Sequence, residues 1–243
     1  MKTYRMECSS QVFLVWAALL FVTWPSDVLV GEFVKTLPAK SLLRASDTIV
    51  HGFIGAFLWQ LMCLLCPALE FNVTYQVSRL ISGRSFFDGK NTASFVNSFL
   101  NFGLAFALSC IIDVDHVFKD LIQSIQGGPR APWERGVLHL SLPPLVTVLL
   151  LYSTAMIFKQ LWCLKCGTII IACVLSHHIR DGIRHGLWFQ PIGTTPVLPY
   201  WLYVVITLIL PFAVGGLASK VSAWITPSQL VASNSFVAKT YII

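Results

Sequence analysis

Apolar residues in this chain come in blocks, and short polar stretches separate one block from the next. One helical crossing of a bilayer needs about 20 predominantly apolar residues. The blocks that approach this length are residues 11–30, 48–69, 93–113, 137–158, 166–183 and 199–219. A lipid-exposed span must pair its own backbone polar groups, which a helix does. The pattern therefore predicts an all-α fold, a polytopic transmembrane helical bundle with about five to six spans.

Several local features add to this prediction. The first block contains Trp24-Pro25, and we interpret it as a retained anchor, with a cleaved signal peptide as the alternative. The block 166–183 is short and ends in polar residues, so we expect it to stop at the membrane interface. Pro143-Pro144 and Pro211 predict kinks in the fourth and sixth spans. Residues 220–243 form a polar tail, and without an internal repeat the chain 1–243 is expected to be a single domain.

The composition agrees with a membrane protein. Hydrophobic residues make up 56% of the 243 residues and charged residues 12%, whereas soluble domains carry about 25% charged residues. The formal net charge of +6 is spread over many loops. Such a distribution suits a membrane surface better than a nucleic acid. We therefore expect a lipid bilayer as the partner and no nucleic acid.

All the histidines fall on one side of the membrane when the spans alternate in direction. These residues are His51, His116, His139, His177, His178 and His185. Asp47, Asp113, Asp115 and Asp181 fall on the same side. This depends on four crossings between residues 48 and 183, because an added or missing span would scatter the set. The sequence thus predicts a polar cluster at which four helix ends converge.

The spacing within this set suggests shared helix faces. Asp47 and His51 are four residues apart, as are His177 and Asp181, so each pair lies on one face of its helix. Imidazole nitrogen together with carboxylate oxygen suits zinc, manganese or iron. Ionisable groups at membrane depth indicate a functional site by default. The alternative is a set of interfacial residues satisfied by water and lipid headgroups.

These residues also resemble motifs of the bacterial inner-membrane metal-dependent hydrolase family, in the same order over about 51–191. The matching stretches are His51-Gly52 with Gly55, then Ile112-Asp113-Val114-Asp115-His116, then Arg135-Gly136-Val137-Leu138-His139, and finally Ser176-His177-His178-Ile179-Arg180-Asp181. Leu138 and Leu140 replace a Thr and a Ser that the family usually has.

The resemblance implies a divalent metal, with zinc as the expected ion, because the bacterial family is thought to be related to zinc-dependent phospholipase C enzymes and nucleases. The implied ligands are His51, Asp113, Asp115, His116, His139, His177 and Asp181. A metal-activated water would attack a phosphoester, with a carboxylic ester as the alternative, and Asp115 or Asp181 would be the general base. Arg135, Arg180 and Arg184 are placed to bind phosphate, a role that competes with simple anchoring on headgroups. A site at the interface implies a lipid or amphiphilic substrate.

Two CxxC pairs, Cys63–Cys66 and Cys163–Cys166, fall on the side opposite the histidines. Four thiolates can bind a structural zinc or form disulfides. Cysteine is also a small apolar packing residue, and we favour that interpretation. Asn72-Val73-Thr74 fits a glycosylation sequon but lies only a few residues beyond a span.

Two functions remain open at this stage. One is a membrane-embedded metal-dependent hydrolase. The other is a non-enzymatic membrane protein, a scaffold or an ion-binding or transport-related protein, that retains the His/Asp cluster. A transport path needs ionisable residues near mid-span, whereas the stretches LVTVLLLYST and VVITLIL are apolar.

Overall fold

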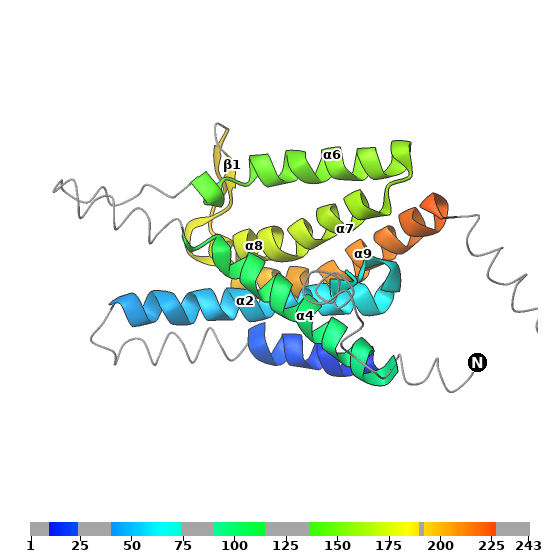
Figure 1. Cartoon of the computed structure of the whole chain (residues 1–243). Coiled ribbons are helices and arrows are strands. Elements are labelled where there is room, and N and C mark those ends of the chain that lie inside the picture. The colour runs from blue at the N-terminus through cyan, green and yellow to red at the C-terminus, as the bar shows by residue number, and fades with distance from the viewer. Residues whose placement is uncertain (1–9, 24–39, 74–89, 115–136, 190–191, 227–243) are drawn as a thin grey trace, which may run out of the picture.

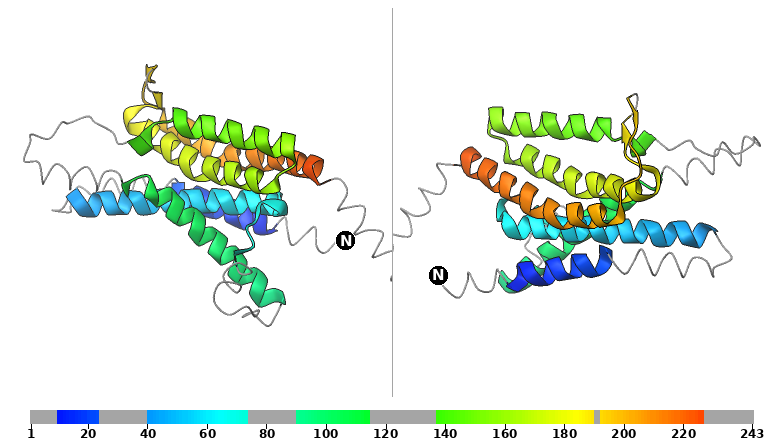
Figure 2. Two further views of the ribbon diagram at one scale, coloured as in Figure 1. Left: turned by 45° about the horizontal axis from the view of Figure 1, so that its top comes forward. Right: turned by 180° about the vertical axis from the view of Figure 1, so that it is seen from behind.

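In the computed structural model the chain forms a bundle of helices that lie side by side (Figure 1). The structure describes residues 10–23, 40–73, 90–114, 137–189 and 192–226. The central helix is α2, Lys40–Leu65, and α4, Lys90–Ile111, crosses it obliquely, as Figure 2 shows from two further directions. Their contact is the most extensive between any two helices of the described residues.

The remaining elements complete the bundle. The first helix is Ser10–Thr23, and the others are α6, Leu142–Phe158, and α9, Tyr200–Ile225. A further 25-residue helix, Leu161–His185, consists of α7, Leu161–Ile170, the π-helical turn η3, Ile171–Leu175, and α8, Ser176–His185. The short 3₁₀ helices are η1, Pro67–Leu69, and η2, Val137–His139. Strands β1, Trp188–Phe189, and β2, Gly193–Thr194, pair antiparallel, with Trp188 opposite Thr194.

The described helices confirm an all-α, polytopic membrane fold. Four of them contain stretches long and apolar enough to cross a bilayer, and these are Ser46–Leu65, Ser94–Ile111, Leu161–His185 and Tyr200–Ile225. The helices Ser10–Thr23 and Leu142–Phe158 are apolar but shorter. Large apolar side chains such as Phe99, Leu149 and Ile157 point outward from the bundle, as expected for surfaces that face lipid.

Some helix boundaries differ from the sequence predictions for physical reasons. Helix α6 begins at Leu142, with Pro143 and Pro144 in its first turn, where a missing backbone N–H costs nothing. The kink predicted there was therefore wrong. The fifth helix begins at Leu161, so that Lys165 lies within it and donates a hydrogen bond to the Glu70 carbonyl. Helix α9 includes Pro211 and ends at Ile225, so the first residues of the expected polar tail are helical.

Small residues allow α2 and α4 to pack closely. A methyl group added at Gly52 would lie 2.6 Å from a ring carbon of Phe106. One added at Gly55 would overlap the Ser109 hydroxyl. Close approach of two helices at glycine is the usual packing device within membranes. It brings His51 of α2 near the residues that follow the end of α4.

The first helix is part of the same core. Its Leu19 is fully buried with the side chains of the other helices, and the Tyr200 hydroxyl of α9 donates to the Thr23 carbonyl at 3.0 Å. Residues 24–30 of the predicted first span lie outside the described residues.

Candidate metal centre

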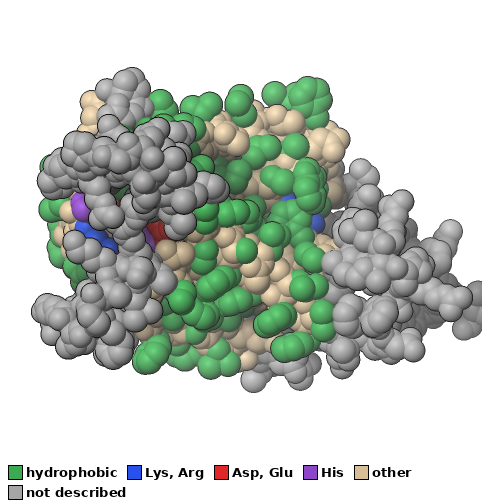
Figure 3. All heavy atoms as spheres, turned by 60° about the vertical axis from the view of Figure 1, so that its left-hand side comes forward, with side chains coloured by type: hydrophobic (Ala, Val, Ile, Leu, Met, Phe, Trp, Pro, Cys, Tyr) green, Lys and Arg blue, Asp and Glu red, His purple; other side chains and the backbone are tan. Residues whose placement is uncertain are grey.

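Four separate parts of the chain meet at one end of the bundle, on the left in Figure 1. Helix α2 supplies His51, the turn after α4 supplies Asp113, η2 supplies His139, and α8 supplies His177 and Asp181. Figure 3 looks at this end, where histidine, basic and acidic side chains are visible beside a largely hydrophobic surface. The convergence predicted from the alternation of spans is thus present for these five residues, which we call the His/Asp cluster.

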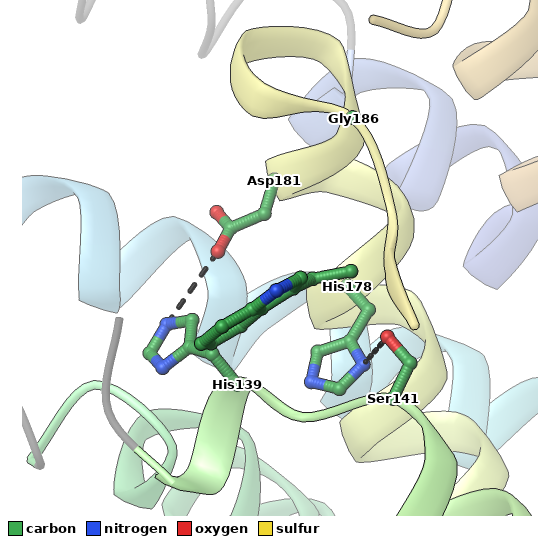
Figure 4. Close-up of a pocket in the computed structure, with 6 residues that line it drawn as sticks. His139, Ser141, His178, Asp181 and Gly186 are labelled. Atoms are coloured by element: carbon green, nitrogen blue, oxygen red, sulfur yellow. Dashed lines mark hydrogen bonds and ion pairs between the residues drawn. The ribbon is translucent and has the colours of Figure 1, made fainter. Parts of the chain in front are cut away.

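The His/Asp cluster is compact. The Nε2 atoms of His139 and His177 lie 3.4 Å apart. Asp181 Oδ2 lies 3.5 Å from the first of these nitrogens and 3.6 Å from the second (Figure 4 marks the contact with His139). Asp113 Oδ1 approaches the same two nitrogens at 3.8 and 3.5 Å. His51 Nε2 lies 3.5 Å from Asp181 Oδ1, and its ring stacks on that of His177 with centroids 3.8 Å apart.

These separations fit a metal centre. Four ligand atoms placed tetrahedrally about 2.0–2.1 Å from zinc lie about 3.3 Å from one another. The distances from His139 Nε2 and His177 Nε2 to each other and to the nearest oxygens of Asp113 and Asp181 are 3.4 to 3.8 Å, only slightly larger. Two overlapping sets of three ligand atoms lie within 4.8 Å, namely His51, Asp113 and His177, and His139, His177 and Asp181. The residues present therefore fit a divalent cation bound by nitrogen and oxygen.

Several polar atoms of the His/Asp cluster are buried without a hydrogen-bond partner. They are both ring nitrogens of His51, Oδ2 of Asp113 and Nδ1 of His177. His51 and His177 are only 2% and 1% exposed. Burial also raises the pKa of the Asp113 carboxyl above its ordinary value. Burying polar groups without partners is costly. Of these atoms, His51 Nε2 faces a carboxylate oxygen of Asp181, so a cation held there would pair it.

The helix that carries His177 is widened just before it. The π-helical turn Ile171–Leu175 ends where α8 begins, and such turns occur frequently at functional sites. The hydroxyl of Ser176 donates to the carbonyl of Ala172 and, at 3.3 Å, to that of Cys173. Ser176 thus pairs backbone carbonyls of the widened turn, immediately before His177, the first candidate ligand on α8.

The segment that carries His139 is held by hydrogen bonds to α8 and to the β-hairpin. Ser141 Oγ lies 3.0 Å from Nδ1 of His178 (Figure 4). The Ser141 N–H donates to the Trp188 carbonyl. The other ring nitrogen of His178 lies 3.4 Å from the Leu138 carbonyl. These residues border a pocket lined by His139, Ser141, His178, Asp181, Gly186 and Trp188. His178 therefore has a structural role.

The two arginines of α8 lie beside the cluster and bind the same carboxylate. Arg180 is 1% exposed, and its Nη1 lies 2.6 Å from Oδ1 of Asp47. Arg184 is 41% exposed, and its Nη1 and Nη2 lie 2.6 and 3.0 Å from the two oxygens of Asp47. The phosphate-binding role assigned to these arginines stays a prediction, and Arg184 is the more accessible of the two.

Three of the residues assigned from the sequence lie outside the described residues, namely Asp115, His116 and Arg135. His185 is exposed at the end of α8. Sequence reasoning gave no role to Ser141, because nothing in its neighbourhood signals a contact with a residue 37 positions later. Asp47 was identified through its spacing from His51, but its partners are arginines of α8.

The described cysteines do not form a metal-binding group like the His/Asp cluster. The described cysteines are free thiols. Within the part of the chain that the structure describes, only the two His/Asp groups bring three metal-ligating atoms within 4.8 Å. Of the sequon, Asn72 is exposed and Thr74 is not described.

The fold and this site define an integral multi-pass membrane protein with a buried His/Asp cluster at one end of its helical bundle. The chain belongs to the transmembrane protein 267 family, since it is 44% identical to transmembrane protein 267 of Bos taurus over 216 residues, 86% of this chain and 85% of that protein. The stretch Leu198-Pro199-Tyr200-Trp201-Leu202-Tyr203 also resembles this family.

Other relatives of the same name match shorter regions. Identity to the Danio rerio protein is 41% over 167 residues, 68% of this chain and 62% of that protein. Identity to the Xenopus laevis protein is 42% over 117 residues, 47% of this chain and 54% of that protein. No family model and no solved structure matches the chain. The shared name states a membrane location and no activity.

Proposed function

We propose that this protein is a membrane-embedded, metal-dependent hydrolase that acts on a phosphoester of a lipid-like substrate at the membrane interface. The observation that carries the proposal is the pair His139 and His177, whose Nε2 atoms lie 3.4 Å apart and 3.5 to 3.8 Å from carboxylate oxygens of Asp113 and Asp181. The resemblance of the surrounding motifs to the bacterial hydrolase family supports the same function.

The residues of the His/Asp cluster have distinct tasks in this proposal. A bound zinc ion lowers the pKa of a water ligand towards neutrality and stabilises negative charge on a phosphoryl oxygen. The Nε2 atoms of His139 and His177 would hold the ion together with carboxylate oxygens of Asp113 and Asp181. Asp181 also faces His51 with its other oxygen. That oxygen, or the carboxylate of Asp115 as assigned from the sequence, would orient a water molecule and accept its proton.

The surroundings favour an anionic amphiphile as the substrate. Arg184 is part-exposed beside the cluster, and a guanidinium matches the geometry of a phosphate. Arg135 is a second candidate for this contact. The outward faces of α4, α6 and α9 are apolar, so acyl chains could remain in the bilayer while the headgroup reaches the site.

A second candidate function is a non-enzymatic membrane protein that binds an ion through the same cluster. Leu138 and Leu140 stand where the bacterial family has hydroxyl residues, and hydroxyls beside a metal often orient its ligands. Their replacement favours ion binding without catalysis.

The metal content of the full-length protein purified in detergent tests the proposal. We expect about one zinc ion per chain in the wild type, and loss of most of it in Asp113→Asn and His177→Gln. His185→Gln is the matched control, because His185 lies on the same helix but is exposed. No zinc in the wild type, or equal zinc in all four proteins, contradicts the site.

Activity separates the two candidate functions. The zinc-loaded protein should release a phosphorylated headgroup from phosphatidylcholine vesicles, and a chelator should stop the release. Zinc binding without hydrolysis of phospholipids or of simple phosphodiesters would favour the non-enzymatic candidate.

A further inference from the structure

We propose that Asp47 and Arg180 form a positioning pair that docks α8 against α2 and thereby sets the distance between His51 and Asp181 in the metal centre. The proposal rests on the proposed function, because it concerns an outer layer of the same site. It gives Arg180 a different task from the phosphate binding that its sequence position suggests.

The pair is buried and spans two helices. Arg180 has a side chain only 1% exposed, and Asp47 Oδ1 lies 2.6 Å from its Nη1. A charge at this depth is strongly unfavourable unless an opposite charge meets it. The Asp47 carboxylate supplies that charge from α2, 133 positions earlier in the chain. The guanidinium therefore fixes where α8 lies on α2.

The position of the pair links it to the cluster. Arg180 directly precedes Asp181, and Asp47 is one helical turn before His51, with its Oδ2 at 4.0 Å from His51 Nε2. His51 also contacts Asp181, at 3.5 Å. This contact and the Asp47–Arg180 ion pair therefore join the same two helices, α2 and α8, one helical turn apart. A shift of α8 that breaks the Asp47–Arg180 ion pair would lengthen the distance between His51 and Asp181.

The pair also keeps a third carboxylate out of the metal centre. Oδ1 of Asp47 contacts Arg180 and Arg184, and Oδ2 contacts Arg184. A carboxylate engaged in this way has little free capacity for a cation. Asp47 therefore belongs to the layer that orients the ligands, a layer whose removal typically weakens metal binding about 10- to 100-fold.

Zinc affinity of the full-length protein in detergent, measured by competition with a chelator, tests this role. We expect Asp47→Asn and Arg180→Met to bind zinc about 10- to 100-fold more weakly than the wild type. Arg180→Lys keeps the charge and should recover most of the affinity. Tyr152→Phe is the matched control, because it removes an interhelical hydrogen bond, 2.8 Å long, to Thr168 on the distant part of the bundle. It should lower thermal stability and leave zinc affinity unchanged.

A metal-free measurement keeps the two proposals distinguishable. The rate at which diethyl pyrocarbonate modifies His51 and His177, followed by mass spectrometry in metal-free protein, should rise in Asp47→Asn and Arg180→Met but not in Arg180→Lys or Tyr152→Phe. Wild-type protein that binds no zinc contradicts the proposed function alone. Unchanged histidine reactivity, or variants that bind zinc as the wild type does, overturns the positioning pair.

Discussion

The two ends of the bundle differ in how far their buried polar groups are paired by hydrogen bonds. At the end away from the His/Asp cluster, Asn101 of α4 accepts from the Phe71 N–H and donates to the carbonyls of Phe71 and Asn97. Glu70 accepts from Ser98 through its side chain and from Lys165 through its carbonyl. Each of these contacts is a hydrogen bond of 2.7 to 2.9 Å.

At the cluster end, both nitrogens of His51, one oxygen of Asp113 and one nitrogen of His177 are buried without such a partner. At the first end the buried Trp59 indole nitrogen, beside Phe71, also has no partner, but the cluster end gathers four such atoms on three neighbouring residues. Proteins tolerate such local cost mainly at functional sites. Substitutions should therefore affect mainly stability at one end and mainly metal binding at the other.

The contact of α2 with α4 lies between the two ends and should matter to both. In Gly55→Leu the added side chain would overlap Ser109 and approach the backbone of Cys173 at 3.5 Å. We expect a loss of about 3 kcal/mol of stability, because overpacked cores cost about 1–3 kcal/mol and occasionally more. Zinc affinity should fall as well, because α2 carries His51 and α4 leads to Asp113. Thermal unfolding in detergent and zinc competition measure the two effects.

Gly103→Leu provides the control for this substitution. A methyl group added at Gly103, on α4, would meet nothing within 4 Å. Its stability and zinc affinity should stay close to those of the wild type. If both glycine variants are equally stable, the close packing of α2 and α4 does not hold the two ends together.

Sequence reasoning could find the helices and the convergence, because both follow from the lengths of apolar blocks and the alternation of spans. It also found five residues of the His/Asp cluster, since each lies near the end of an apolar block that alternation places on one side. It could not find the partners of Asp47 or the role of Ser141, because these depend on how α8 is rotated and on where the β-hairpin packs. Neither quantity is encoded in local periodicity.

The helix boundaries show the same limit. Lys165 looks like a residue outside a span until its hydrogen bond to Glu70 is known. Pro143 and Pro144 predict a kink when the helix is assumed to begin at 137, but they start the helix that begins at Leu142. The error in each case came from a tertiary contact or a helix start that composition does not reveal.

Substitution of Asn101, at the end away from the His/Asp cluster, should change the stability of the protein and leave its zinc affinity unchanged. In Asn101→Ala the Phe71 N–H and carbonyl both lose their side-chain partner. Leaving buried backbone groups unpaired costs about 1–3 kcal/mol, so we expect a loss of about 2 kcal/mol in the free energy of unfolding. Zinc affinity should remain within error of the wild-type value, because His51 and Asp113 lie at the other end of the helices.

The informative measurement is again the pair of thermal unfolding and zinc competition on one preparation. A loss of zinc affinity in Asn101→Ala as large as that in Asp113→Asn would contradict a division of labour between the ends. The wild-type stability in the presence of a chelator is the reference for both variants.

A substitution of Ser176 tests whether residues next to the His/Asp cluster also affect metal binding. Ser176 directly precedes His177, yet its hydroxyl donates within its own helix, to the carbonyls of Ala172 and Cys173. Removal of this hydroxyl in Ser176→Ala should cost about 0.6 kcal/mol, the average for a side-chain hydrogen bond in a membrane protein. We expect zinc affinity to change by less than about threefold, because no ligand loses its own partner. Zinc competition on Ser176→Ala, with His177→Gln as the reference for ligand loss, distinguishes the possibilities. A drop that approaches the reference would mean that the π-helical turn sets the position of His177, and that the metal centre extends one turn further into the bundle than its buried, unpaired atoms indicate.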